Sequence, residues 1–340
     1  MDYKSSGVDI DAGNETVRRI KGLARATFTP GVLSEIGSFG GLFSLGADWR
    51  DAVLVSSADG VGTKLKIAFM TGRHDTIGVD LVNHCVNDIL VQGAVPLFFL
   101  DYLATGRLSP DVAEQIVKGL ARGCQENGCA LLGGETAEMP GFYSEGEYDV
   151  AGFIVGAVER AELITGASIA AGDLLIGLPS SGLHTNGYSL ARRVVFDGLG
   201  LSVDSHVPDL GETVGEALLR PHRSYLPVVK PLLGTGLIKG MAHITGGGIT
   251  DNLPRVLPAG LAARVERRAW RTPALFRWLG ESGSVPEMDL RRALNMGIGF
   301  VLVIDPKDIG DVQAKLLDAG EANSMIIGRI EPGAGEVHYV

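Results

Sequence analysis

The stretch Ser56–Lys64 constrains the fold most, because it follows directly on the apolar run Ala52–Val55. A β-branched run that ends in an acid and two closely spaced glycines predicts a buried strand that delivers a carboxylate and backbone N–H groups to a loop. Asp59 is then a candidate ligand for Mg²⁺, Lys64 is a candidate positive charge, and the glycines let the main chain approach phosphate oxygens. The alternative is an ordinary tight turn with a solvated acid and lysine.

This stretch is not a Walker A loop. Its order is Gly-Thr-Lys, and no run in the chain fits Gly-x-x-x-x-Gly-Lys-Ser/Thr. Any phosphate chemistry must therefore be built in another way.

Composition limits the classes of partner. The formal charge of −10 argues against nucleic acid and anionic membranes, which attract clustered Lys and Arg. The apolar runs are too short to span a membrane, and the 3 cysteines have no metal-ligand spacing. We therefore expect a cytoplasmic protein. Its 340 residues suggest two domains, which we place at 1–167 and 168–340 because a polar linker precedes a fresh strand there.

Two more acidic positions lie near the ends of predicted elements. A helix predicted over Thr76–Gly93 carries Asn87 and Asp88 on a polar arc without Lys or Arg at pairing distance. A later strand runs into glycines and Glu135. Since α/β folds collect strand ends at one edge, these residues and Asp59 together predict a divalent-metal site. A solvated polar surface is the alternative.

The second half contains two Gly-rich loops. Ser180–Gly187 precedes one predicted helix, and Thr245–Gly248 precedes another that we expect to begin at Asp251 or Asn252. Exposed backbone amides at a helix start favour anions, so either loop is a candidate phosphate site. His184 has the only side chain there that titrates near neutral pH, which makes it a candidate base. A structural histidine and flexible turns are the alternatives.

The two ends of the chain give weaker signals. Residues 1–14 are predicted to form a loop, with Asn14 as the cap of the helix that follows. Because this loop is Gly-rich and carries Lys4, we expect it to be a lid that nucleotide orders. The last predicted strand is Ser324–Ile330.

A family resemblance is carried, in this order, by Tyr3-Lys4, Gly7–Asn14, Asp59–Lys64, His74–Gly78, Cys85–Asp88, Val91–Ala94, Phe98–Tyr102, Gly133–Gly141, Asp149–Gly152, His184–Leu190 and His243–Gly248. Over nearly its whole length the chain resembles the phosphoribosylformylglycinamidine cyclo-ligases, the aminoimidazole ribonucleotide synthetases. Ala58 stands where that family usually has Thr, a change that removes no metal ligand.

The resemblance implies an α/β protein of the α+β type. Its N-terminal half would form a β-barrel across a homodimer, and its C-terminal half would be α/β. ATP and Mg²⁺ would be the cofactors. The formyl oxygen of formylglycinamidine ribonucleotide would attack the γ-phosphate, and ring closure would give 5-aminoimidazole ribonucleotide, ADP and phosphate in de novo purine biosynthesis.

The resemblance also implies roles for single residues. The catalytic residues would be His184, Asp59 and Asp88, and the metal ligands Asp59, Asp88 and Glu135. The nucleotide would contact Lys4, Asp59, Gly60, Gly62, Thr63, Lys64, Asn87, Asp88, Gly133, Gly134 and Glu135. The ribonucleotide would contact Ser181, His184, Asn186, Gly187, Thr245, Gly246, Gly247 and Gly248.

Families of the same architecture make selenophosphate, thiamine diphosphate or the cyanide ligand of hydrogenases with ATP. No cysteine precedes Cys85, and the chain ends in His338-Tyr339-Val340 without a terminal Cys, so we expect neither a selenophosphate synthetase nor a hydrogenase-maturation protein. A sister phosphoryl-transfer enzyme and a non-catalytic nucleotide-binding subunit are the alternative functions.

Overall fold

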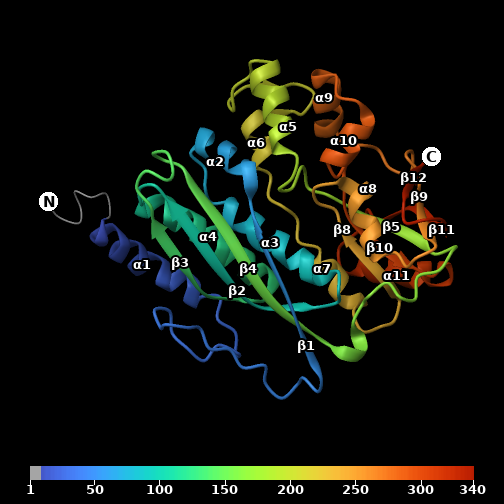
Figure 1. Ribbon diagram of the computed structural model, residues 1–340, viewed down its shortest axis with the longest axis horizontal. Helices are drawn as coiled ribbons and strands as arrows, with labels where there is room; N and C mark the ends of the chain where they lie inside the picture. The colour runs from blue at the N-terminus through green and yellow to red at the C-terminus, as the bar shows by residue number, and fades with distance from the viewer. Residues whose placement is uncertain (1–8) are drawn as a thin grey trace. The chain divides into compact units, whose positions relative to one another are not determined.

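The structure is a computed structural model that describes residues 9–340. The chain divides into two units, each with a sheet and packed helices (Figure 1). The N-terminal unit contains the chain up to Ile89 together with Val95–Glu159, and the C-terminal unit contains Leu90–Ala94 and Arg160–Val340. This mixture of helices and strands agrees with the expected α/β class.

The N-terminal unit is built from α1 (Ile10–Arg25), β1 (Ala52–Gly60), η1 (Gly62–Lys64), α2 (Leu65–Thr71), α3 (Ile77–Leu90), β2 (Val95–Thr105), α4 (Pro110–Asn127), β3 (Ala130–Glu138) and β4 (Tyr148–Glu159). The strand order is β1-β4-β2-β3. Strand β4 is antiparallel to both of its neighbours, and β2 is parallel to β3. Strands β1, β2 and β3 therefore run in one direction, and their carboxyl ends lie along the same edge.

Helix α3 packs tightly against both the sheet and α4. A Cβ on Gly152 of β4 would lie 2.9 Å from Leu81 Cγ of α3. Where α3 meets α4, a Cβ on Gly78 would lie only 2.2 Å from the backbone nitrogen of Leu120, and one on Gly119 would lie 2.5 Å from the Asp75 carbonyl oxygen. Glycines thus let the two helix backbones come close, which fixes the position of α3 over the sheet.

The C-terminal unit contains β5 (Leu174–Pro179), α5 (Tyr188–Arg192), β6 (His206–Val207), β7 (Glu212–Thr213), α6 (Val214–Leu219), α7 (Leu226–Val229), β8 (Ile238–His243), α8 (Gly248–Asn252), β9 (Leu261–Val265), α9 (Ala274–Gly283), α10 (Glu287–Ala293), β10 (Ile298–Ile304), α11 (Ile309–Asp318), β11 (Met325–Pro332) and β12 (Val337–Tyr339). Its main sheet has the order β12-β9-β11-β5-β10-β8, and only β12 and β9 pair in parallel. Every residue of β10 is buried, as its apolar sequence requires. Within residues 9–340, no helix has the length and apolar character needed to cross a membrane.

The start of the first helix differs from the prediction. Helix α1 begins at Ile10, so Asn14 lies inside it and is not its cap. Asp9 caps the helix instead, because its backbone is extended and its side chain accepts hydrogen bonds from the N–H groups of Asp11 and Ala12. The rest of the expected lid, with Lys4, lies outside the described residues.

Several other boundaries were also predicted wrongly. Strand β3 continues through the glycines to Glu138, because it pairs with β2 over Leu100–Thr105. Helix α8 begins at Gly248, three residues before the earlier of the two expected starts. The strand expected to be last is followed by β12. In the two strand cases, pairing with distant segments overrides the local turn signal.

The contact between α3 and α4 yields a stability test. We expect Gly78→Ala to lower Tm clearly, since overpacking costs about 1–3 kcal/mol and the contacted atoms are backbone that cannot rotate away. Gly22→Ala in α1 is the matched control, because a Cβ there meets nothing within 4 Å. It should keep or raise Tm, since Ala is favoured over Gly in a helix by about 1 kcal/mol. Equal Tm values for the two variants would contradict the close helix contact.

Candidate functional site

Strand β1 and helix α3 bring two of the predicted metal ligands together. His84 Nε2 lies 2.7 Å from Asp59 Oδ2 and 3.7 Å from Asp88 Oδ2. Ser57 Oγ donates a hydrogen bond to Asp88 Oδ2 at 3.1 Å. The contact follows from two periodicities, because alternate residues of a strand share a face and residues four apart on a helix do the same. For Ser57 and His84 the sequence predicted no role.

The charges at this cluster fit a site for a divalent cation. Burial lowers the pKa of His84, but the hydrogen bond to Asp59 and the charge of Asp88 outweigh that effect, and the net pKa is raised. A positive charge is therefore favoured between the two carboxylates. The side chains of Asp59 and Asp88 are 45% and 24% exposed, so a cation can reach them from solvent. Their oxygen donors suit Mg²⁺.

Lys64 occupies a different environment from the one predicted. Its side chain and that of Asp80 are both 0% exposed, and Lys64 Nζ lies 2.8 Å from Asp80 Oδ1. Burial lowers the pKa of Lys64, and the charge of Asp80 opposes this. Asp80, a further acid of α3, therefore has a counter-charge, which comes from Lys64 and not from the helix itself. The assignment of Lys64 to phosphate stays a prediction, and so does that of the fully buried Asn87.

Glu135 does not join the other two predicted ligands within one chain. Asp59, Gly152, Asp101 and Gly134 form one row across the sheet, from β1 through β4 and β2 to β3. Glu135 follows Gly134 in β3 and so faces the opposite side of the sheet. Three strand spacings, about 14 Å in total, also separate the backbones of β1 and β3. The predicted glycines Gly60 and Gly133 lie in strands β1 and β3, whereas Gly62 and Thr63 lie in η1.

Asp101 is a further acid in this row. A Cβ on Gly134 would lie 2.4 Å from Asp101 Oδ1, so the glycine makes room for this carboxyl group. Burial raises the pKa of Asp101 to about 7. The sequence analysis assigned no role to this acid.

In the C-terminal unit, the two Gly-rich loops approach each other. We call Ser180–Gly187 the first loop and Thr245–Gly248 the second loop. A Cβ on Gly246 would lie 3.1 Å from Asn186 Oδ1. The predicted ribonucleotide contacts of the two loops thus come from one region of this unit.

The two loops are adjacent, but the expected reason for anion binding, free backbone amides at a helix start, is only partly met. Helix α5 has 5 residues and continues directly into a π-helix over Arg193–Gly198, and α8 has 5 residues and continues into a 3-10 helix over Leu253–Val256. The N–H of Gly247 already donates to the Arg292 carbonyl at 2.9 Å, and that of Gly248 donates to the Thr245 carbonyl at 3.0 Å. Two of the expected amide donors are therefore used inside the fold.

Three buried histidines lie in or beside these loops. His184 is 1% exposed and has a φ of 63°, an uncommon backbone conformation for a residue other than glycine. Its Nε2 accepts the Ser181 N–H at 3.2 Å. Its ring stacks on His222, and ring nitrogens of His184, His222 and His243 lie within 4.8 Å of one another. His222 was missed because its segment matches no motif, and His243 was noted only as a neighbour of the second loop and as part of the family resemblance.

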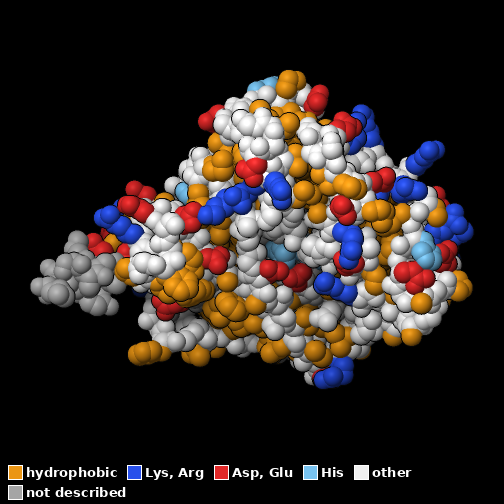
Figure 2. Space-filling view, turned by 45° about the horizontal axis from the view of Figure 1, so that its top comes forward, with side chains coloured by type: hydrophobic (Ala, Val, Ile, Leu, Met, Phe, Trp, Pro, Cys, Tyr) orange, Lys and Arg blue, Asp and Glu red, His pale blue; other side chains and the backbone are white. Residues whose placement is uncertain are grey.

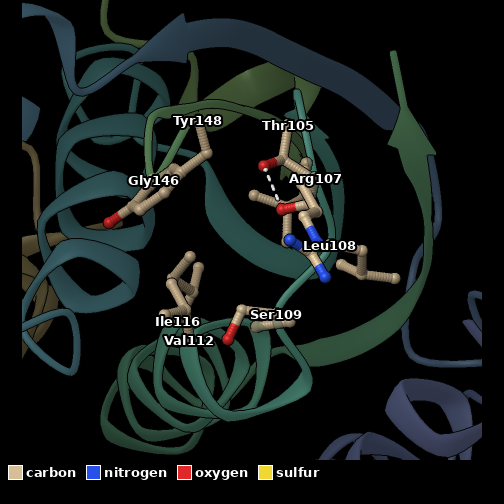
Figure 3. A pocket seen from close by; sticks show the side chains of 10 residues that line it. Thr105, Arg107, Leu108, Ser109, Val112, Ile116, Gly146 and Tyr148 are labelled. Atoms are coloured by element: carbon tan, nitrogen blue, oxygen red, sulfur yellow. Dashed lines mark hydrogen bonds between the residues drawn. The ribbon is translucent and has the colours of Figure 1, made fainter. Parts of the chain in front are cut away.

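Two pockets lie elsewhere, and none of the predicted site residues within 9–340 lines them. Figure 3 shows the first, in the N-terminal unit, where Thr105 Oγ1 donates to the Arg107 carbonyl. Its volume of about 40 Å³ suits a few water molecules rather than a substrate. The second has about 390 Å³ and is lined in the C-terminal unit by residues between Ala161 and Ser168 and between Leu232 and Lys239.

Comparison with known proteins identifies the family of this chain. The family models described as AIR synthase related protein match residues 46–158 with the N-terminal domain and residues 170–340 with the C-terminal domain. The chain belongs to this family. The gap between the two matches contains the division that the structure shows after Glu159.

Similar curated proteins cover almost the whole chain. A phosphoribosylformylglycinamidine cyclo-ligase of Trichlorobacter lovleyi is 56% identical over 330 residues, which are 97% of this chain and 94% of the relative. The protein of the same name from Desulfitobacterium hafniense is 55% identical over 339 residues, 99% of both chains.

Solved structures show the same fold at low identity. A thiamine-monophosphate kinase from Stenotrophomonas maltophilia has a TM-score of 0.70 at 20% identity and covers 96% of this chain and 95% of its own. The hydrogenase maturation protein HypE, solved in complex with ATP, has a TM-score of 0.67 at 17% identity, with coverages of 96% and 90%.

Proposed function

We propose that this protein is an ATP-dependent cyclo-ligase that converts formylglycinamidine ribonucleotide to 5-aminoimidazole ribonucleotide, with release of ADP and phosphate, in purine biosynthesis. The observation that carries this proposal is the 55% identity over 99% of the chain to a phosphoribosylformylglycinamidine cyclo-ligase. The paired carboxylates of Asp59 and Asp88 supply the chemistry that such a reaction needs.

The reaction depends on positioning and charge more than on covalent help from the protein. Asp59 and Asp88 would hold Mg²⁺ with ATP, and the bound ion would neutralise charge on the polyphosphate. His84 contacts both carboxylates from the buried side, and the Gly60 N–H donates to Asp59 Oδ1, so protein contacts fix the orientation of Asp59. Glu135 would belong to the nucleotide site only if a second chain supplies it, since it faces the other side of the sheet.

The metal assignment is tested with Asp59→Asn. We expect kcat/KM for Mg·ATP to fall about 100-fold, because charge stabilisation by a bound metal is worth several kcal/mol. Steady-state rates across a Mg²⁺ titration, with Tm measured in parallel, provide the readout. Asp111→Asn is the control, since that side chain is 83% exposed and forms only a surface ion pair with Arg19. Wild-type Mg²⁺ dependence in Asp59→Asn would refute the assignment.

The ribonucleotide would bind at the two loops of the C-terminal unit. Support comes from their adjacency at Gly246 and Asn186 and from their polar side chains, which include Ser181 and Thr245. His184 lies in the first loop and remains our candidate for the base that takes the ring-closing proton, since an imidazole is suited to proton transfer near neutral pH. Its burial means that substrate must displace part of the loop to reach it.

Gly246→Ala tests the loop assignment. Gly247 is a poor probe, because its φ of 96° strains any other residue. A Cβ on Gly246 would instead only narrow the gap to the flexible Asn186 side chain. We expect KM for the ribonucleotide to rise about tenfold and KM for ATP to stay unchanged, as loss of binding for one substrate alone requires. Gly310→Ala, where a Cβ meets nothing within 4 Å, is the control. Equal rises for both substrates would contradict the assignment.

A homodimer is the third part of the proposal. One face of the N-terminal sheet is covered by α3, while the other leaves Leu54 of β1 and Phe153 of β4 exposed by 59% and 45%. Figure 2 shows hydrophobic side chains at the surface between charged ones. An exposed apolar sheet face is a common protein interface, so a second copy of this sheet is its natural occupant.

We expect Phe153→Asp to shift the protein from dimer to monomer in sedimentation velocity, because it places a charge in the apolar face. Leu317→Asp is the control, since Leu317 of α11 is also 60% exposed but lies in the C-terminal unit. A Phe153→Asp dimer with unchanged stability would show that the sheet face is not the interface.

A further inference from the structure

His222 connects the two loops that the proposed function assigns to the ribonucleotide. Its Nε2 lies 3.1 Å from His243 Nε2, and its Nδ1 lies 3.4 Å from Thr185 Oγ1. Thr185 belongs to the first loop, and His243 ends β8 two residues before the second loop begins at Thr245. One buried side chain therefore reaches toward both loops through its two ring nitrogens.

The ring of His222 also supports His184 directly. The two rings stack with a centroid distance of 3.9 Å and an angle of 17°. Both side chains are 1% exposed. The stack extends to Tyr225, whose ring meets that of His184 edge-on at 6.2 Å and whose hydroxyl donates to the Pro179 carbonyl.

The residues next to His222 hold the first loop as well. Ser181 Oγ donates to the Pro221 carbonyl at 2.6 Å, and Arg220 Nη1 donates to the Ser181 carbonyl at 3.2 Å. Because His184 holds a φ of 63°, its loop needs such external contacts to keep this conformation. The segment Arg220–Tyr225 supplies them.

Ring geometry favours hydrogen bonding over metal coordination in this cluster. A bound metal lies in the plane of each imidazole, along its nitrogen lone pair. The rings of His184 and His222 are stacked and nearly parallel, so no single position near them lies in the planes of both rings. Nε2 of His184 also accepts the Ser181 N–H, whereas the second nitrogen of a metal-bound histidine normally donates.

We propose that His222 is a positioning residue, which holds His184 by stacking and the start of the second loop through His243, so that the two loops form one surface for the ribonucleotide. This inference rests on the proposed roles of His184 and of the two loops. It assigns a function to a residue that neither a motif nor the catalytic chemistry identifies.

Two partial substitutions separate the stack from the hydrogen bond. His222→Phe keeps an aromatic ring against His184 and loses the bond to His243, while His222→Gln keeps a polar group near His243 and loses the stack. We expect His222→Ala to lower kcat/KM for the ribonucleotide about 10- to 100-fold, since a misplacement of about 1 Å costs that much. The partial variants should lose less, and KM for ATP should stay within about twofold.

A matched control removes a buried histidine elsewhere. His74 is 7% exposed, and its Nδ1 lies 3.0 Å from the Tyr148 hydroxyl in the N-terminal unit. His74→Gln should change Tm without the selective loss for the ribonucleotide. If His74→Gln and His222→Gln change the two KM values alike, His222 is only a structural residue and the proposal is wrong.

A double substitution decides whether His222 acts through His184. In the His184→Gln background, His222→Phe and His222→Gln should have little further effect on kcat, because residues that act together are not additive. Additive losses would refute this inference and leave the role of His184 intact. Full activity of His184→Gln alone would refute both the role of His184 and the inference.

Gly299→Ala is a way to disturb the stack of His184 and His222 without substituting His222 itself. A Cβ on Gly299 of β10 would lie 2.5 Å from His184 Cε1 and would also collide with the Tyr225 hydroxyl, so it must displace the stack. Gly240→Ala in β8 is the control, because its Cβ would meet Ile169 at 2.7 Å on the apolar side of the same sheet. We expect a selective rise in KM for the ribonucleotide in Gly299→Ala alone, and equal behaviour of the two variants would count against the proposal.

Discussion

The buried ion pair between Lys64 and Asp80 holds the N-terminal site together. Asp80, His84 and Asp88 are spaced four residues apart and form one stripe along α3. The segment from β1 to η1 runs along this stripe, with Ser57 against Asp88, Asp59 against His84, and Lys64 against Asp80. Removing one partner of a buried pair costs about 3–5 kcal/mol, because the other charge then has no compensation. The pair therefore keeps strand and helix in a fixed register, and that register brings the two exposed carboxylates within reach of one cation.

The sequence predicted the acids of this arrangement but not the residues that face them. Helical spacing put the acids of α3 on one face, and the acid and glycines after Ala52–Val55 placed Asp59 near the end of a strand. The identity of the facing residues could not be read from local pattern, because Lys64 meets Asp80 only after η1 folds back along α3. The same holds for Glu135. Its position depends on β4 lying between β1 and β2, a strand order that no short-range signal encodes, and on β3 continuing past its glycines, which shifts the acid to the opposite face.

The C-terminal unit shows where local signals mislead in another way. Both Gly-rich loops were found from their composition, and the structure brings them together. The reason for expecting anions there was a set of exposed backbone amides at each helix start, yet the N–H groups of Gly247 and Gly248 already donate to carbonyl groups inside the fold. The glycines instead allow close packing, as at Gly248, where a Cβ would lie against the Arg291 carbonyl. His222 is the clearest omission, because its contacts to the first loop and to His243 arise from a segment more than thirty residues after the first loop and without any motif.

The two units therefore would offer different chemistry to a bound phosphate. The N-terminal unit presents carboxylates, which repel a polyphosphate unless a cation lies between them. The first and second loops of the C-terminal unit contain no acid and no Lys or Arg, and offer hydroxyl, amide and backbone groups. A phosphate bound by such neutral donors needs no metal ion. If the proposed assignment of substrates to units is right, Mg²⁺ should control the affinity for ATP and leave that for the ribonucleotide nearly unchanged. The cation requirement of the reaction is then a consequence of which side chains each unit directs at its anion.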